Sequence, residues 1–493
     1  MTFWGPYLSE RQWGTVREDY SADGDAWNYF SHDHARSRTY RWGEDGLAGI
    51  SDLRQTLCFA LALWNGKDPF LKERLFGLTN AEGNHGEDVK ELYFYLDATP
   101  DHSYLKMLYK YPQAEFPYEQ LLQENQKRGL DDNEYELVDT GVFDDDRYWD
   151  VFVEYAQVSD DDILVNVSVH NRGPESATIH VLPHLWFRNT WSWDSNAPRK
   201  PTLRTDGSGA IHASHHSLGD YFLYVDGEAS LLFCDNDTNV RVVYGQQAEG
   251  YFKDAFHRYI ANSNHAAVNP SQQGTKACVQ FVRDVPAQQC AQFRLRLCAN
   301  QNEAPFRDFD NLFSARVREC DDYYANLQRG ISDPDARLVQ RQALAGMIWS
   351  KQRYAYNVQR WLDGDDNFPE PPASRLAGRN QDWTHLNGDA IFSMPDKWEY
   401  PWFAAWDLAF HTVTFALIDS EFAKQQLIQL GHVWYLHPTA SCLPTSGTSQ
   451  MPIRPSMLGP PTVYFRSIVS RSARKILTTP AIWFFSSASF RNY

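Results

Sequence analysis

The sequence predicts a multidomain protein with β structure in its first 300 residues and α-helices after them. Three observations predict this organisation. The chain has 493 residues, more than one ordinary domain contains. Over much of residues 148–299 apolar side chains recur at every second position, the period of a half-buried strand. After Pro305 the apolar spacing becomes three and four residues, which is typical of an amphipathic helix.

The clearest strand is expected where Ile163, Val165, Val167 and Val169 alternate with their neighbours. A turn at residues 170–173 follows it, and the alternation then resumes. Short strands with turn signals between them favour an antiparallel sandwich over residues 1–300, with long loops. Residues 1–145 are predicted to be rich in loops. The other expected strands cover residues 91–96, 177–181, 221–225, 230–234, 240–244, 277–282 and 292–298.

The helical part is expected to begin with a linker helix within residues 301–333. Apolar residues from Phe309 to Leu327 recur there at helical spacing. Residues 334–438 are then expected to form the first helices of a second domain. Their expected bounds are about 334–353, 402–417 and 421–434, the last one capped by Asp419 or Ser420.

Composition narrows the class of partner. The formal net charge of −17 argues against a nucleic acid or an anionic membrane surface. Aromatic residues make up 15% of the chain, which favours a carbohydrate substrate, because sugar rings stack on aromatic faces. The seven cysteines are scattered without a C-x-x-C pair, so neither a disulfide framework nor a zinc site is supported. No phosphate-binding Gly loop or dinucleotide fingerprint is found, and no metal or other cofactor is predicted. With no leader peptide and no long apolar run, a cytoplasmic location is expected. The oligomeric state is not predicted.

The candidate catalytic residue is Asp407. Trp398, Tyr400, Trp402 and Trp406 precede it within nine residues. A carboxylic acid walled by aromatic rings is poorly hydrated, which favours its protonated form. This combination indicates a general acid in a carbohydrate site. The alternative is a helix start whose aromatics lie in the core, with Asp407 in an ion pair or capping the helix.

Other acidic and histidine residues are rivals for a functional role. Glu399 is the strongest rival acid, and we assign it to substrate hydroxyl binding or to the helix start. The pair His32 and His34 has no matching carboxylate cluster, so packing or hydrogen bonding is favoured over a metal site. The remaining rival acids are Asp382, Asp389 and Asp396.

Several motifs, in this order, resemble glycoside hydrolase family 63, in particular its cytosolic glucosidase-like branch, related to processing α-glucosidase I. The resemblance runs from the first residues to about Pro438. The motifs that carry it lie at residues 10–20, 32–36, 41–46, 79–90, 185–191, 397–402 and 405–411.

The resemblance implies a β super-sandwich followed by an (α/α)6 barrel of the six-hairpin type, and cleavage of α-glucosides with inversion of configuration. It implies that Asp407 is the general acid and that Trp402 lines a sugar subsite. Trp383, Trp398, Tyr400 and Trp406 are expected to shape the same pocket. The family's base is a glutamate late in the barrel, and we find no counterpart here, so the barrel is expected to be incomplete. The alternatives are a glycoside phosphorylase of similar plan and an inactive sugar-binding protein.

Residues 439–493 differ from the rest of the chain. They contain no Asp or Glu, one Lys and five Arg, and many Ser, Thr and Pro residues. Disorder is the general expectation for this composition, with a basic interaction tail as the alternative. If the reading frame shifts by one nucleotide after Pro438, the possible codons permit a sequence like that of family members. We therefore expect a tail translated out of frame, which sequencing of the transcript tests.

Overall fold

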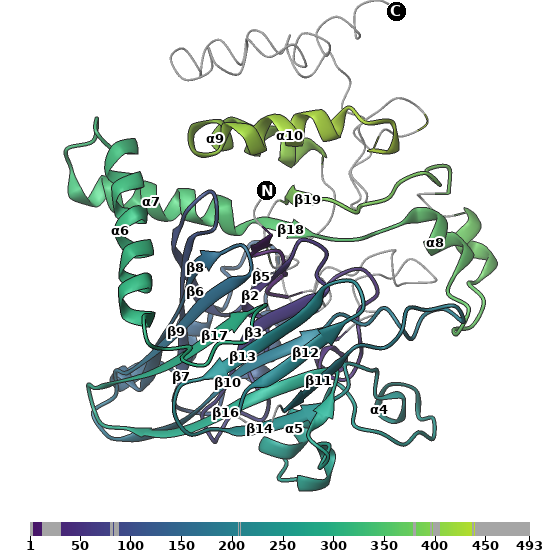
Figure 1. Cartoon of the computed structure of the whole chain (residues 1–493), viewed down its shortest axis with the longest axis horizontal. Helices are drawn as coiled ribbons and strands as arrows, with labels where there is room; N and C mark the ends of the chain where they lie inside the picture. Colours follow the sequence, from purple (N-terminus) through teal and green to yellow (C-terminus); the bar gives the residue numbers. More distant parts are fainter. Residues whose placement is uncertain are drawn as a thin grey trace, which may run out of the picture.

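The computed structural model describes residues 3–11, 31–78, 82, 88–205, 207, 209–377, 381–394, 397, 405–435 and 438, without the side chains of residues 88, 405, 406 and 433. Two antiparallel sheets dominate this described part (Figure 1). The first has the strand order β1-β2-β3-β10-β16-β14. Its strands are Trp4–Gly5, Leu47–Asp52, Leu57–Trp64, Ala177–Phe187, Lys276–Val285 and Ser230–Cys234.

The second sheet has the order β15-β11-β12-β13-β17-β9-β8-β7-β6. Its strands are Gln273–Gly274, Thr202–Thr205, Ile211–His215, Gly219–Val225, Cys290–Cys298, Asp162–Asn171, Tyr148–Ser159, Tyr104–Pro112 and Leu92–Ala98. Two small pairings add β4 (Gly77–Leu78) with β5 (Asp88–Val89) and β18 (Lys351–Arg353) with β19 (Ile391–Ser393). The antiparallel sandwich expected from the alternation is confirmed.

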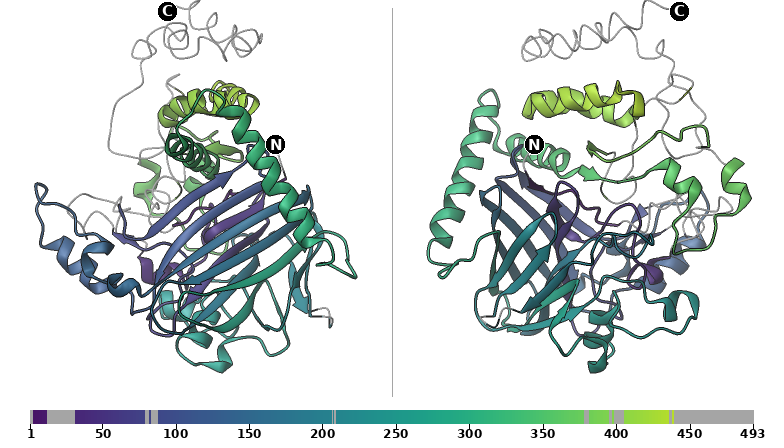
Figure 2. Two further views of the ribbon diagram at one scale, coloured as in Figure 1. Left: turned by 90° about the vertical axis from the view of Figure 1, so that its left-hand side faces the viewer. Right: turned by 45° about the vertical axis from the view of Figure 1, so that its right-hand side comes forward.

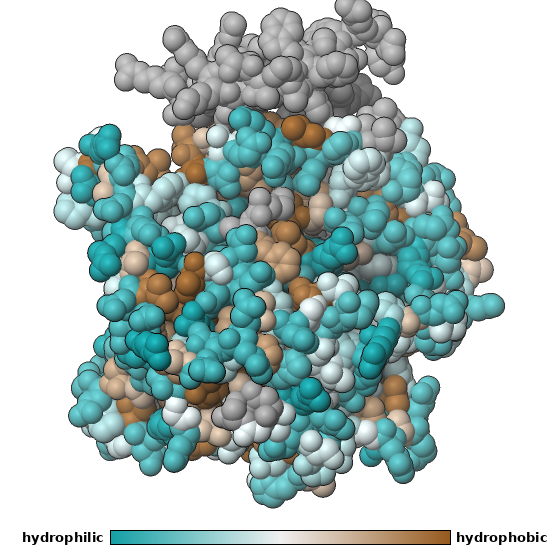
Figure 3. All heavy atoms as spheres, in the orientation of Figure 1, coloured by the Kyte–Doolittle hydropathy of each residue, from teal (hydrophilic) through white to brown (hydrophobic). Residues whose placement is uncertain are grey.

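The main core lies between the two sheets. Phe59, Val181 and Val279 face inward from the first sheet, and Val153 and Val167 face them from the second. All five are at most 2% exposed. Side chains on a strand alternate between its two faces, so the period of two in the sequence separates core from surface. Figure 3 accordingly shows a face that is mainly hydrophilic, with apolar residues in small separate groups.

Two expectations about strands are wrong. Residues 1–145, expected to be mostly loops, hold several strands. Among them, β3 was missed because it is buried on both faces and its apolar run shows no alternation. Val240–Tyr244, expected as a strand, forms the single-turn helix α4. Its Val243 N–H donates to Asn239 O at 3.0 Å, and Gly245 ends it with a positive φ of 66°. Val242 and Tyr244 remain exposed. Because β-branched residues favour strands mainly by packing on a sheet, this run without such packing does not form one.

The long helix α6 (Phe309–Leu327) lies against the second sheet (Figure 2). Phe309 packs there with Ala156 of β8 and Leu164 of β9. Helix α7 (Pro334–Trp349) then crosses the end of the sandwich beside β6. A helix within residues 301–333 is confirmed, and its role as a linker between two domains stays a prediction. The expected helix from 334 to 353 is four residues too long, since residues 351–353 form β18.

Helices α9 (Ala405–Ile418) and α10 (Ser420–Leu430) pack against each other above α7 (Figure 1). The side chain of Asp419 caps α10 by accepting a hydrogen bond from Phe422 N at 2.9 Å, as expected. The (α/α)6 barrel stays a prediction, because the described helices do not form a closed ring. No helix in the described ranges is long and apolar enough to cross a membrane.

The remaining helices are short. They are α2 (His32–Ala35), α3 (Tyr118–Gln126), α5 (Ala255–Ile260) and α8 (Val358–Asp363). Turns of 3-10 helix lie at Leu137–Thr140, Asp144–Asp146, His265–Ala267, Ala373–Ala377 and Val433–Tyr435.

Trp349 joins α7 to the sandwich. Its ring is fully buried and stacks on Tyr95 of β6 at a centroid distance of 5.0 Å. Its Nε1 donates to Asp97 O at 3.2 Å. Arg341, two turns earlier on α7, donates to the Asp97 carboxylate from Nε at 2.9 Å. This contact sets where the helices that follow can lie.

We predict that Trp349→Ala lowers the free energy of unfolding by about 3–5 kcal/mol, through the cavity it leaves and the lost hydrogen bond. Leu338→Ala is the matched control on α7, because Leu338 is 53% exposed. It should change stability by less than about 0.5 kcal/mol. Urea unfolding followed by far-ultraviolet circular dichroism measures both. Equal effects of the two substitutions would contradict this role of Trp349.

Candidate functional site

Asp407 lies in the first turn of α9, where it is partly exposed. Its carboxylate makes no hydrogen bond or ion pair with any described residue. The alternative of an Asp407 engaged in an ion pair is therefore not observed in these ranges. The next residue, Leu408, is 1% exposed and anchors this end of α9 in the core. The burial of Leu408 thus fixes the backbone at Asp407, whose own side chain is partly exposed.

Trp383 is the one predicted pocket aromatic whose side chain is described. It is 1% exposed and belongs to the same hydrophobic cluster as Leu408, together with Phe392 and Tyr435. The structure therefore places Trp383 in the packing beneath Asp407. Trp398, Glu399, Tyr400 and Trp402 lie outside the described residues, as does the side chain of Trp406. The rival acids Asp382 and Asp389 are exposed, and Asp389 pairs with Arg353. Asp396 lies outside the described residues.

Sequence reasoning missed His411, one helical turn after Asp407. Its Nδ1 lies 2.7 Å from Ser393 Oγ on β19, and Ser393 Oγ lies 3.3 Å from Ser350 Oγ at the end of α7. Burial lowers the pKa of His411, and the nearby Asp407 carboxylate opposes that shift. The i, i+4 spacing of an acid and a histidine on one helix was the available signal.

Lys397 was also missed, although it opens the motif that precedes Asp407. Its Nζ donates to Pro6 O at 2.5 Å. Its carbonyl oxygen accepts hydrogen bonds from Ser9 Oγ at 2.5 Å and from Glu10 N at 2.8 Å. These contacts join positions nearly 390 residues apart in the sequence. The residue before Trp398 is thereby tied to the N-terminal segment of the sandwich.

Glu10 and Lys397 are both fully buried, at 0% and 2% exposure. Burial raises the pKa of Glu10 to about 7, with Lys397 and the hydrogen bond from Ala48 N opposing the rise. Burial likewise lowers the pKa of Lys397 to about 7, with Glu10 opposing. Each group is therefore close to changing its charge near neutral pH.

Stability should depend on pH through Glu10. The folded pKa lies above the unfolded value of 4.5, so the folded state binds the proton more tightly. Its contribution is full below about pH 4.5 and is lost as pH rises to 7. Relative to Glu10→Gln, the wild-type protein should lose about 3 kcal/mol between these limits. Urea unfolding of both proteins from about pH 4.5 to 7.5 tests this, and parallel stability curves would contradict it.

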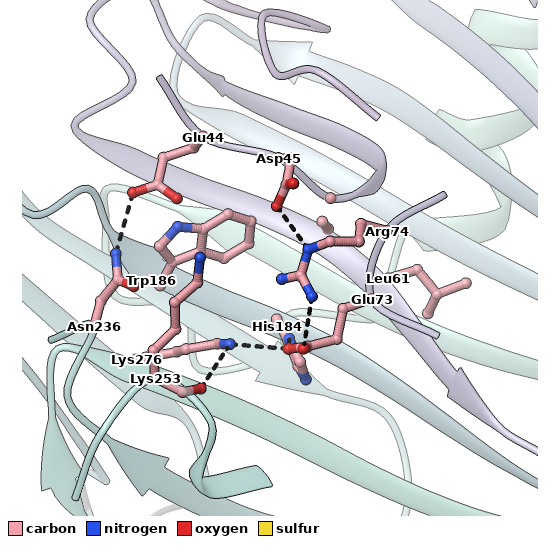
Figure 4. Close-up of a pocket in the computed structure, with 12 residues that line it drawn as sticks. Glu44, Asp45, Leu61, Glu73, Arg74, His184, Trp186, Asn236, Lys253 and Lys276 are labelled. Atoms are coloured by element: carbon pink, nitrogen blue, oxygen red, sulfur yellow. Dashed lines mark hydrogen bonds and ion pairs between the residues drawn. The ribbon is translucent and has the colours of Figure 1, made fainter. Parts of the chain in front are cut away.

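A buried cluster of charged groups lies on the outer face of the first sheet (Figure 4). Lys276 of β16 donates from Nζ to Glu73 Oε1 at 3.0 Å, and Arg74 Nη1 donates to Glu73 Oε2 at 3.3 Å. Arg74 Nε also donates to Asp45 Oδ1 at 3.1 Å. The acids are Glu44, Asp45 and Glu73, and the bases are Arg74, Lys253 and Lys276.

This cluster is a structural network rather than a ligand site. Its cavity of about 20 Å³ holds roughly one water molecule. Burial alone would raise the pKa of Glu73, but Lys276 and Arg74 hold it well below its usual range. Burial lowers the pKa of His184 to about 3, so its ring is neutral. Charges of opposite sign are thus balanced inside the protein. The network holds the loop of residues 41–46 against β10 and β16.

Removing one partner of this network should cost more than removing two. Lys276→Met leaves the Glu73 carboxylate without one of its cations and should lower the unfolding free energy by about 3–5 kcal/mol. Lys276→Met with Glu73→Met should recover part of that loss. The exposed pair Lys127 and Glu124 supplies the control, where Lys127→Met should cost at most about 1 kcal/mol. Denaturant unfolding of the wild type, Lys276→Met, Glu73→Met, the double variant and Lys127→Met measures the coupling. A double variant whose loss equals the sum of the two single losses would contradict it.

A larger hollow of about 370 Å³ lies between the sandwich and the start of α10. Lys351 lines it, buried, with Nζ donating to Pro100 O at 3.1 Å and to Asp419 Oδ2 at 3.4 Å. Burial lowers the pKa of Lys351 to about 8. Asp419 follows the last residue of α9, whereas Asp407 is in its first turn. At about 1.5 Å per residue, the twelve residues from Asp407 to Asp419 put the hollow about 18 Å along the helix from the candidate acid.

No family model matches the chain. Its sequence is 43% identical over 483 residues to the uncharacterized protein YMR196W of Saccharomyces cerevisiae, a match that covers 88% of this chain. The chain spans 44% of the length of that relative. The yeast protein shows that sequences like this one occur within a longer chain, and it supplies no activity.

Three solved structures show a weak likeness. A putative aldose 1-epimerase from Escherichia coli has a TM-score of 0.21 and 9% identity, covering 41% of this chain and 67% of its own. A putative kojibiose phosphorylase from the human microbiome has a TM-score of 0.24 and 11% identity, and the match covers 80% of this chain and 46% of the phosphorylase. A galactose mutarotase related enzyme from Lactobacillus acidophilus has a TM-score of 0.19 and 8% identity, and the match covers 51% of this chain and 94% of that enzyme. All three names describe enzymes that act on sugars, but TM-scores this low establish no shared function.

Proposed function

We propose that this chain carries the sugar-binding and proton-donating part of a glycoside hydrolase of the family 63 type, which cleaves an α-linked glucoside with inversion. Asp407 is the general acid. The observation that carries the proposal is the partly exposed Asp407 carboxyl group, unpaired among the described residues and directly preceded by an aromatic-rich motif. Catalysis by such an acid consists of giving its proton to the glycosidic oxygen as the bond to the anomeric carbon breaks.

The pocket is assigned to Trp383, Trp398, Tyr400, Trp402 and Trp406, with Glu399 binding substrate hydroxyl groups. The aromatic faces bury the apolar side of the sugar ring, and the carboxylate reads its hydroxyl groups. Trp383 supports this pocket from the core beneath Asp407. The proposal assigns no base glutamate within the chain, and it names no residue that activates the attacking water.

The proposal also keeps the division into a β-sandwich domain at 1–300, a linker helix at 301–333, catalytic helices at 334–438 and an atypical tail at 439–493. The protein acts in cytoplasmic carbohydrate metabolism. Its partner is a neutral carbohydrate, which fits a chain with a net charge of −17.

Azide can test the acid without a protein base. As an anion, azide attacks the anomeric carbon unaided, so the glycosidic carbon–oxygen bond breaks while a carbon–nitrogen bond forms. Asp407 gives its proton to the leaving oxygen and regains one from water. With an α-linked glucose disaccharide, we expect azide-dependent release of glucose and formation of β-glucosyl azide. Asp407→Asn should lower this rate by roughly 10²–10⁴-fold.

α-Glucosyl fluoride is the matched substrate, since fluoride leaves without being protonated by a carboxylic acid. Asp407→Asn should therefore spare the fluoride while it impairs the disaccharide, and Asp382→Asn should affect neither. Equal loss on both substrates would show that Asp407 is not the acid. Turnover that requires phosphate would favour the phosphorylase. Saturable binding of the sugar without turnover would favour the inactive sugar-binding protein.

A further inference from the structure

Three elements converge on His411. Ser350 is the C-cap of α7, Ser393 is the last residue of β19, and His411 lies in the second turn of α9. Ser393 is fixed further because its N–H donates to Gln426 Oε1 of α10 at 3.0 Å. Ser350, Ser393 and Gln426 are at most 6% exposed. The imidazole of His411 is therefore held by buried groups whose own positions are fixed by neighbouring elements.

Counting donors along this chain of hydrogen bonds gives it a direction. Ser350 Oγ donates its only proton to Met347 O at 2.7 Å. Ser350 Oγ has no proton left for Ser393, so in the hydrogen bond between the two hydroxyl groups Ser393 Oγ is the donor. This bond uses the single proton of Ser393 Oγ. Ser393 Oγ can in turn only accept from His411, so Nδ1 of His411 must carry a proton. In the neutral ring Nε2 is then left with a free lone pair.

The electrostatic surroundings keep this ring neutral. Burial lowers the pKa of His411, and the Asp407 carboxylate opposes the shift. Ser393 of β19 contacts the ring, and Ser350 at the end of α7 and Gln426 of α10 hydrogen-bond to Ser393; none of these three titrates. An imidazolium one turn from Asp407 would favour the carboxylate form of the acid, whereas a neutral ring does not.

We propose that His411 is a positioning residue for Asp407. The Ser393–Ser350 chain fixes its imidazole as the neutral form protonated on Nδ1, which places an acceptor nitrogen and no positive charge one helical turn from the acid. Residues at i and i+4 of a helix are neighbours on its surface, so this nitrogen is within the reach of the Asp407 side chain. The inference rests on the proposed function only for the role of Asp407. The proton on Nδ1 follows from the hydrogen bonds, and the neutral charge of the ring follows from its burial.

Long-range ¹H–¹⁵N spectra of the full chain, labelled on histidine, test the imidazole directly. The wild-type protein should show a protonated Nδ1 and a bare Nε2 for His411 at neutral pH. Ser393→Ala should release the ring to the form protonated on Nε2, and Thr412→Val should not. Thr412 is the matched control, because it is buried on the same helix and donates to Ala409 O at 2.7 Å, apart from the serines. An imidazolium, or a proton on Nε2 in the wild-type protein, would overturn the proposal.

Titration of the same signals tests the coupling. The Asp407 carboxylate raises the pKa of His411, so Asp407→Asn should lower that pKa further. Thr412→Val should leave it unchanged. An unchanged pKa in Asp407→Asn would remove the link between the two residues, whatever the turnover assays show.

Turnover supplies the functional readout. His411→Leu should lower kcat on the disaccharide by roughly tenfold, with KM within about twofold and little effect on α-glucosyl fluoride. His411→Gln keeps a donor for Ser393 and an acceptor on the other side, and it should restore most of the rate. Equal losses of kcat in both variants, on the disaccharide and on α-glucosyl fluoride alike, would show that His411 contributes only packing and would overturn its positioning role. If instead Asp407→Asn is fully active, the proposed function fails while the state of the imidazole is unaffected.

Discussion

The surroundings of Asp407 depend on one constraint: buried polar groups at the junction of sandwich and helices must satisfy each other. Gln55 donates from Nε2 to Tyr7 O at 2.6 Å and to Arg353 O at 3.1 Å, and Arg353 N donates to Tyr7 O at 3.1 Å. A buried polar group without a partner costs about 1–3 kcal/mol, so few arrangements of these segments are tolerable. The N-terminal segment is consequently held on one side by β2 and the turn that follows β2, and on the other by β18.

The same constraint extends to the candidate site from two sides. On one side, Lys397, the residue before Trp398, is fixed by its hydrogen bonds with Pro6, Ser9 and Glu10. On the other side, the hydrogen bonds between Ser350 and Ser393 and between Ser393 and His411 connect α7 and β19 to α9. Precise geometry around a catalytic group needs supporting side chains that are themselves fixed, and buried hydrogen bonds provide that support better than apolar packing, which tolerates small shifts. The start of α9 is thus positioned by groups that belong to the sandwich and to α7.

Sequence reasoning recovered what local periodicity encodes. Strands β9, β13 and β17 of the second sheet were visible because their apolar residues alternate, whereas β7, β11 and β12 of the same sheet were not predicted. Helices α6 and α10 were visible from their spacing and from the cap at Asp419. β3 escaped because both of its faces are buried, and α4 was misassigned because its valines find no sheet. Asp407 stood out through its neighbours in the sequence. Ser350, Ser393 and Glu10 did not, because their roles arise from contacts between distant segments, which no local pattern records.

The contrast between the two groups of carboxylates bears on function. In the sandwich, Glu73 is matched by Lys276 and Arg74, and Asp45 is matched by Arg74, so burial is compensated charge by charge. Asp407 lacks such a partner among the described residues, and its nearest titratable neighbour on the helix is kept neutral by burial. At the start of α9 the helix dipole stabilises a carboxylate by about 0.3–1 kcal/mol, and no cation among the described residues adds to this. Departures of this kind are expected where function, rather than stability, determines the residue. An acid that must hold a proton and then release it to a substrate oxygen has to remain free of a permanent cationic partner. Within the described part of the chain no cation pairs with Asp407, which agrees with the proposed role.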